Sequence, residues 1–141
     1  MEKRINMITK KIDELINLLL TKGVQPSDIA SNIFLNDYSS ICYRKIDGRV
    51  VGELLIQETD ISSSKLRYYY NLTQEVIKIE EEFMGVTSVI WDRNFAESKI
   101  VNELVSLLKD VYDERQISKF ISTLPKSLQS KVIDEVNKLT A

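Results

Sequence analysis

The side chains that could do chemistry in this sequence are few, because the chain contains no histidine and a single cysteine, Cys42. Histidine is the commonest general base near neutral pH and the commonest transition-metal ligand. Its absence excludes Ser-His-Asp and Cys-His catalysis and the usual zinc sites. One cysteine cannot form a disulfide within the chain or a thiolate zinc cluster, and it favours a reducing compartment. We interpret Cys42 as a packing thiol, since no helix N-terminus is predicted nearby to activate it.

Carboxylates and glycines also lack the spacing that catalysis or cofactor binding requires. The acidic run at residues 80–82 contains no Glu-x-x-His pattern of a di-iron centre, so a solvated helix end explains it. The chain has four glycines, which are scattered and form no phosphate-binding loop: Gly23, Gly48, Gly52 and Gly85. We therefore expect no catalytic residue, no metal ligand and no cofactor, and a protein that is not an enzyme.

A group of cations offers one route to nucleic-acid binding. Residues 20–30 resemble the first helix and turn of a helix-turn-helix, and a hairpin soon afterwards is typical of winged-helix domains. Arg44, Lys45 and Arg49 would place positive charge at the tip of that hairpin, where it could contact phosphates. The segment between Phe34 and the hairpin is too short and too acidic for a recognition helix. A small winged-helix-like DNA-binding regulator is therefore the alternative hypothesis, not the favoured one.

Two further groups combine residue types that occur in binding sites. Lys65 and Arg67 precede three consecutive tyrosines, a mixture found where single-stranded nucleic acid stacks. A helix would spread those tyrosines about 100° apart, so we interpret them as core and surface residues instead. Trp91 and Arg93 are of the types that most often anchor protein interfaces. Their structural interpretation is a buried tryptophan followed by a helix cap.

The elements that must position these residues are best defined at residues 41–57. Two β-favouring runs flank Asp47-Gly48, a dipeptide favoured at both central positions of a type I′ turn. The register that follows places Ile41 opposite Leu54. One face of the hairpin is then apolar and should pack on helices, through Ile41, Tyr43, Val50, Leu54 and Ile56. The other face is only partly polar, and Val51 and Leu55 make it a candidate partner surface.

The rest of the chain has mainly helical periodicity. We predict helices over residues 2–22, from Pro26, from a polar junction at residues 60–64 to Gly85, from Asn94, around Ile117 and at the C-terminal end. Residues 86–91 are a candidate third strand for the hairpin, or the start of a helix. The first helix carries an apolar seam with coiled-coil spacing, which runs through Ile5, Ile8, Ile12, Leu15 and Leu19.

Composition places these elements in a single globular domain over residues 1–141, and a net charge of -2 gives no general attraction to nucleic acid or anionic membranes. No apolar run is long enough for a membrane span and no signal peptide is evident, so we expect a cytoplasmic protein. The predicted fold is α+β and mostly helical, with a small antiparallel sheet packed against a bundle of about four to five helices.

The predicted function is a non-enzymatic intracellular protein-protein interaction module. It is expected to form homo-oligomers through the seam of the first helix or an exposed sheet edge. Missing catalytic chemistry and an apolar surface larger than one small core needs are the two reasons. The interaction candidates are Ile5, Ile8, Ile12, Val51, Leu55, Trp91 and Arg93.

Overall fold

A computed structural model describes residues 2–57, 59 and 62–140 of the chain. These residues cluster into two compact units, which we call the sheet unit and the helical unit. The sheet unit comprises Thr21–Asn94, and the helical unit comprises the residues before and after it. The expectation of a single domain over residues 1–141 stays a prediction.

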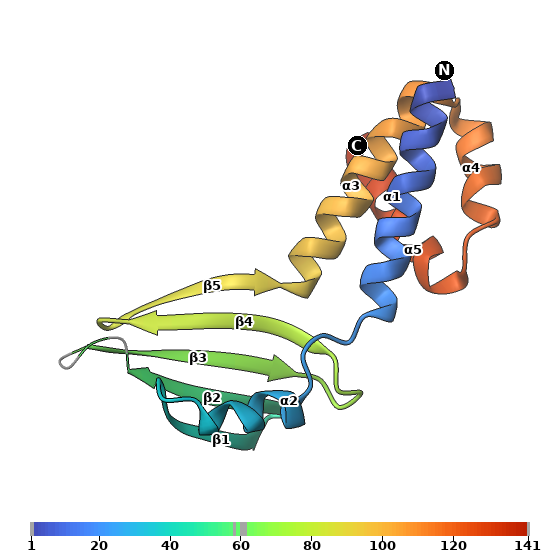
Figure 1. Cartoon of the computed structure of the whole chain (residues 1–141). Coiled ribbons are helices and arrows are strands. Elements are labelled where there is room, and N and C mark those ends of the chain that lie inside the picture. Colours follow the sequence, from blue (N-terminus) through green and yellow to red (C-terminus); the bar gives the residue numbers. More distant parts are fainter. Residues whose placement is uncertain (1, 58, 60–61, 141) are drawn as a thin grey trace. The chain divides into compact units, whose positions relative to one another are not determined.

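The sheet unit contains a five-stranded antiparallel sheet in the order β1-β2-β3-β4-β5, in which every strand pairs with the next one along the chain (Figure 1). Its strands are β1 (Tyr38–Ile46), β2 (Arg49–Gln57), β3 (Ser63–Tyr70), β4 (Val76–Phe83) and β5 (Val86–Asp92). The α+β class agrees with the sequence analysis. The expectation of a mostly helical protein with a small hairpin or three-stranded sheet is wrong, because it understates the sheet, which has five strands.

The main error is the helix predicted from the junction at residues 60–64 to Gly85, because this segment forms the hairpin of β3 and β4. Residues 60 and 61 of the predicted junction lie outside the described residues. The tyrosines and β-branched residues of this hairpin favour strands. The turn contains no glycine, and Asn71 organises it instead. The side-chain oxygen of Asn71 accepts hydrogen bonds from the backbone N–H groups of Thr73 at 3.1 Å and Glu75 at 3.0 Å. Gln74 supplies the positive φ, at 67°.

Residues 86–91 do form a strand, but β5 pairs with β4 and not with the predicted hairpin. The turn between β4 and β5 consists of Met84 and Gly85, whose φ angles are 51° and 79°. Two successive positive φ angles are what a type I′ turn requires, so Gly85 closes a hairpin here and does not end a helix.

The hairpin of β1 and β2 is confirmed. Asp47 and Gly48 adopt φ angles of 50° and 75°, and Ile41 pairs with Leu54 as the turn chemistry predicts. Gly52 lies opposite Tyr43, and a β-carbon at Gly52 would approach the Tyr43 ring to 2.7 Å. Glycine is therefore required at this position so that the tyrosine ring can lie across the strand.

One face of the sheet packs on the short helix α2 (Pro26–Ala30), which continues as the 3₁₀ helix η1 (Ser31–Phe34). The buried core between α2 and this face consists of Ile29 from α2 and of Leu54, Tyr70 and Val76 from the sheet. Ile41, Tyr43 and Val50 pack around it, as predicted for the apolar side of the hairpin. The Tyr43 hydroxyl donates to the carbonyl of Pro26 at 2.6 Å. This segment is thereby held against the sheet.

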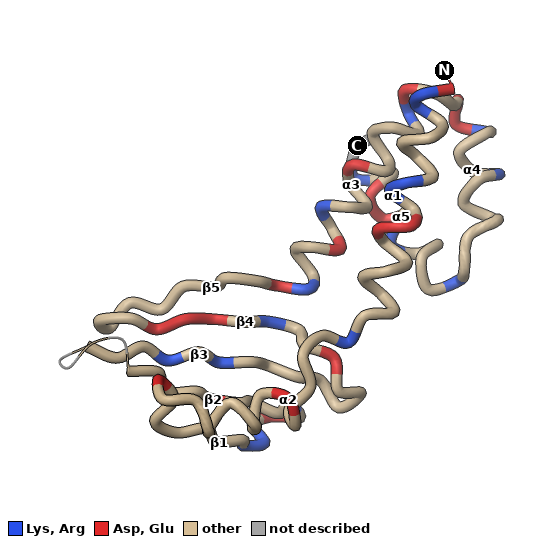
Figure 2. The backbone as a smooth tube through the Cα atoms, viewed as in Figure 1, with Lys and Arg blue, Asp and Glu red and all other residues tan. Residues whose placement is uncertain are grey.

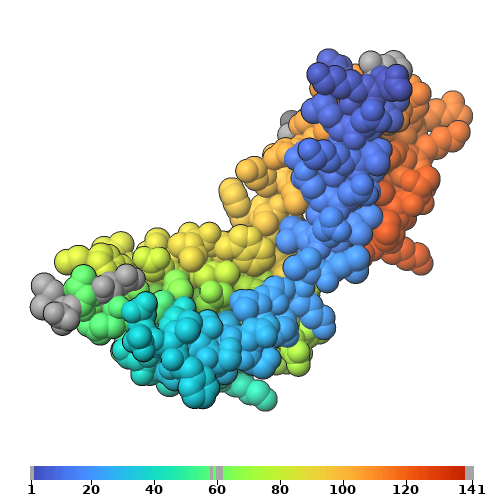
Figure 3. Space-filling model, viewed as in Figure 1, coloured from blue at the N-terminus to red at the C-terminus, as the bar shows by residue number. Residues whose placement is uncertain are grey.

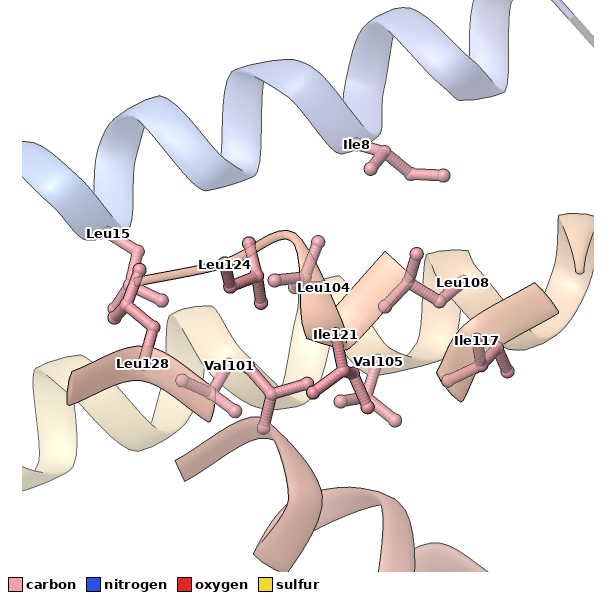
Figure 4. Close-up of a cluster of buried hydrophobic side chains, with 11 residues drawn as sticks. Ile8, Leu15, Val101, Leu104, Val105, Leu108, Ile117, Ile121, Leu124 and Leu128 are labelled. Atoms are coloured by element: carbon pink, nitrogen blue, oxygen red, sulfur yellow. The ribbon is translucent and has the colours of Figure 1, made fainter. Parts of the chain in front are cut away.

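The helical unit contains α1 (Glu2–Leu20), most of α3 (Arg93–Val111), α4 (Glu114–Ser122) and α5 (Lys126–Thr140). Its core is a cluster of aliphatic side chains that all four helices and the α4–α5 connection supply, including Leu15, Leu104, Ile117, Leu124 and Leu128 (Figure 4). Asp113 and Gln116 form a capping box that starts α4. Among the described helices, none combines the length and the apolar character needed to cross a membrane.

Candidate interaction surface

The predicted seam of the first helix is used within the helical unit. Ile8 is 3% exposed, and Ile12 packs against the same core as Leu15. Ile5 lies one turn earlier and keeps 39% of its surface exposed. The three seam candidates are thus not brought together as a free apolar stripe, because two of them contact the helices of their own unit.

Val51 and Leu55 point to the face of the sheet opposite α2, which we call the polar face because Arg67, Glu53 and Glu80 lie at its centre. Leu55 is half-buried, whereas Val51 is almost completely buried, with 4% of its surface exposed. Val51 therefore forms part of the floor of this face, with little of its surface exposed. Replacing Val51 with a charged residue would consequently affect folding as well as any association.

The polar face is organised by cross-strand rows of side chains. One row runs across all five strands and consists of Cys42, Glu53, Arg67, Glu80 and Val89. Arg67 donates to Glu53 at 3.0 Å and to Glu80 at 3.1 Å, and its third nitrogen reaches Glu82 at 3.1 Å in the neighbouring row. The hydrogen bond to Glu53 is the main reason that the pKa of Arg67 is raised.

Glu80 is the most buried acid of this network, at 8% exposed. Burial by itself raises the pKa of Glu80, but hydrogen bonds from the Tyr69 hydroxyl and from Arg67 outweigh it, so the pKa of Glu80 is lowered. Burial together with the hydrogen bond to Glu80 raises the pKa of Tyr69 to about 12. The network is internally paired, which points to a structural role.

Arg93 is a structural anchor of the sheet unit. It is 6% exposed, and its Nε donates to the backbone carbonyl of Val76 at 2.7 Å. An Nη donates to the carbonyl of Thr21 at 2.9 Å. Trp91 is half-buried against the core beneath α2, with the Arg93 guanidinium 5.3 Å from its ring centre. The structure therefore places Trp91 and Arg93 side by side, in the interior contacts of the unit.

The apolar surface that remains exposed on the sheet unit lies on β5. Every residue from Val86 to Ile90 is exposed, and Val86, Val89 and Ile90 keep 68%, 56% and 54% of their surface. Phe83 and Met84 extend this surface into the preceding turn, at 38% and 80% exposed. In Figure 3 the yellow atoms of β5 form a border of the sheet unit. We call residues 83–90 the β5 edge.

The β5 edge lacks the charges with which proteins ordinarily protect sheet edges. No residue from Val86 to Trp91 is charged, and Figure 2 shows a plain strand up to Asp92 beside a strongly charged β4. An extra residue at Ile90 interrupts the pairing with β4, so the regular part of the edge is Val86 to Val89. On the outer side of β5, no other strand pairs with it among the described residues.

The opposite edge of the same sheet is protected. β1 carries Arg44 and Lys45, both exposed, and its pairing with β2 is irregular between Tyr38 and Ser40. Charged side chains and irregularities are two common devices against edge-to-edge association. A sheet edge was predicted from the sequence only in general terms, and no residue of β5 before Trp91 was a candidate, because edge position depends on the order of strands in the folded sheet.

The helix-turn-helix hypothesis for residues 20–30 stays a prediction. Its second helix does begin at Pro26, but α2 is five residues long and ends in a 3₁₀ turn. Phe34, the last residue of that 3₁₀ turn, is 89% exposed.

Metal ligation has no evident site: across the residues that the structure describes, no group of three or more Cys, Asp or Glu side chains is arranged to hold an ion. Comparison of the chain with protein-family models, with curated proteins and with solved structures found no match.

Proposed function

We propose that this protein is a protein-protein interaction module that self-associates by pairing β5 of one copy with β5 of another. One observation carries the proposal: the sheet has a charged, irregular edge at β1 and an uncharged, exposed apolar edge at β5. An exposed apolar edge strand offers unpaired backbone groups and apolar side chains together, which is the arrangement that β-strand addition uses.

A second copy fits this edge better than a charged strand would. Because residues 86–91 hold no charge, antiparallel pairing of the segment with itself brings no like charges opposite each other in any register. A two-fold axis between the copies would close the assembly as a dimer, because both free apolar edges are used. The charged β1 edges would remain outermost and would oppose further growth of the sheet.

The contact is expected to be weak and reversible. A regular edge of four residues with the adjoining turn forms an interface below the standard size. Burying the exposed parts of Val86, Val89 and Ile90 contributes about 1 kcal/mol for each side chain, and much of the total is offset by the loss of rotational and translational freedom. We expect a dissociation constant on the order of 10 to 100 μM.

Sedimentation velocity of the full chain, from about 5 μM to about 500 μM, tests the proposal. We expect the sedimentation coefficient to rise from that of a monomer to that of a dimer. Val89→Lys places a cation in the middle of the edge and should weaken the dimer by at least about tenfold. Cys42→Lys is the matched control, because Cys42 is exposed at the other end of the same cross-strand row.

A monomer at the highest concentration would refute self-association. Equal weakening by Val89→Lys and Cys42→Lys would refute the assignment to β5 and indicate a general charge effect. Loss of the dimer in Cys42→Lys alone would move the interface to β1. Circular dichroism of each variant establishes that its sheet is intact before the comparison is made.

A further inference from the structure

A second surface feature lies on the polar face, at the turn between β1 and β2. It is a hollow of about 510 Å³, and its lining includes Arg44, Arg49, Val51, Arg67 and Tyr69. We call it the arginine pocket. Three of these side chains belong to one cross-strand row, in which Arg44 pairs with Val51 and Val51 pairs with Tyr69. The row places a cation, an apolar floor and an aromatic ring next to one another on three neighbouring strands.

The arginines of this pocket differ in whether acidic side chains compensate their positive charge. Arg67 is bound by Glu53, Glu80 and Glu82, so its charge is already compensated. Arg44 and Arg49 are exposed, and neither forms an ion pair or side-chain hydrogen bond with another residue in the part of the chain that the structure describes. Asp47 is the single acid in the lining. Two guanidinium groups are thus available at the rim of the pocket.

The floor of the pocket favours an anion that can contact the apolar and aromatic side chains as well as the two arginines. Val51 is 4% exposed, and the Tyr69 ring carries the ammonium group of Lys78 at 4.3 Å from its centre. Guanidinium groups bind phosphate oxygens in a bidentate geometry, and aromatic rings on a sheet surface stack nucleobases. Inorganic phosphate would use the two arginines and would make no contact with the apolar floor or with the Tyr69 ring.

We infer that the arginine pocket binds a nucleotide, with the phosphate held by Arg44 and Arg49 and the base placed over Val51 and Tyr69. A volume of about 510 Å³ is within the range of small-ligand sites. The nucleotide can be free in solution or be one unit of a single strand, because both present the same phosphate and base. The inference is independent of β5 pairing, since β5 contributes no residue to the pocket lining described above.

Calorimetric titration of the full chain with inorganic phosphate, with a 5′-mononucleotide and with a short single-stranded oligonucleotide tests this inference. We expect the mononucleotide to bind at least about tenfold more tightly than phosphate, because only the nucleotide gains stacking. Much tighter binding of the oligonucleotide than of the mononucleotide would identify a strand as the source. Equal affinity for phosphate and mononucleotide would refute the placement of the base.

Matched variants locate the site. Arg44→Gln with Arg49→Gln should reduce mononucleotide affinity by at least about tenfold. Lys45→Gln removes one positive charge between them, on the opposite face of the hairpin beside Val50, and should change the affinity by less than about threefold. Tyr69→Leu should lower affinity for the mononucleotide but not for phosphate. Absence of nucleotide binding, or binding that survives the double arginine substitution, would overturn the inference.

Discussion

Arg93 holds together two segments of the sheet unit that are distant in sequence, and its removal should be among the most damaging single changes in the chain. Its guanidinium donates to Val76 at 2.7 Å and to Thr21 at 2.9 Å, with a longer contact of 3.4 Å to Lys22. Arg93→Met keeps the apolar stem of the side chain but leaves the buried carbonyl of Val76 and the part-buried carbonyl of Thr21 without the donors that arginine supplies. The expected result is partial or complete loss of the join between the start of β4 and the segment before α2.

The magnitude follows from the two shorter hydrogen bonds. Each hydrogen bond from a charged donor contributes about 1.5 to 3 kcal/mol, so the pair represents about 3 to 6 kcal/mol. Methionine no longer has to bury a charge, and this relief offsets part of the loss. We expect a net decrease of about 3 kcal/mol in the free energy of unfolding, or a shift of about 1.5 M in the urea midpoint.

Urea unfolding followed by the fluorescence of Trp91 measures this change in the sheet unit, because Trp91 is the only tryptophan. Far-UV circular dichroism is the second probe, since the substitution also alters the surroundings of the Trp91 ring. Arg93→Lys keeps the charge but cannot reproduce the planar fork, so it should restore only part of the stability. Arg115→Met, at an exposed arginine of α4, should change the stability by less than about 0.5 kcal/mol. A loss below about 1 kcal/mol for Arg93→Met would refute the anchoring role of Arg93.

Three other perturbations test the sheet unit. Gly52→Ala should destabilise it by about 1 to 3 kcal/mol in urea unfolding, because the new β-carbon would displace the ring of Tyr43; an unchanged midpoint would contradict that contact. Alkaline titration followed by tyrosine absorbance should show that Tyr69→Phe removes a group with a pKa of about 12, and removal of a group near pH 10 would contradict the buried hydrogen bond. Because the pKa of Glu80 is lowered in the folded protein, its stabilising contribution is fully present above pH 4.5 and is lost as the pH falls below that value. Arg67→Met leaves the buried carboxylate without its cation, so the variant should lose less stability on acidification than the parent, and a parallel pH profile would rule this out.

The sequence predicted the part of the sheet that has strong local chemistry. Asp47 and Gly48 both favour the positive φ angles of a tight turn, so the first hairpin and its register follow from a few neighbouring residues. The turn at Asn71 has no glycine, and its Asx hydrogen bonds are formed only when the chain has already reversed. The tyrosine-rich segment before it fits a helical period and a strand period equally well, which explains the wrong helix.

The candidate surface was harder to predict, because it depends on tertiary contacts that the sequence does not show. Arg93 and Trp91 were identified by residue type, yet residue type does not distinguish an interface anchor from an internal one. Val51 alternates with the residues that face α2, but whether the opposite face is exposed depends on the side chains of β3. The β5 edge depends on strand order, and the arginine pocket depends on Tyr69 lying beside Val51. Neither is visible from spacing along the chain.

The order of the strands has a consequence for synthesis of the protein on the ribosome. Because each strand pairs with the one before it, the sheet can grow one strand at a time as the chain emerges, without waiting for distant segments. While β4 is the newest strand, Lys78 and the three glutamates at residues 80–82 provide charges that discourage contact with other nascent chains. β5, whose residues 86–91 carry no charge, is added last of the five strands. The surface best suited to pairing with another chain is therefore displayed only once the rest of the sheet has formed.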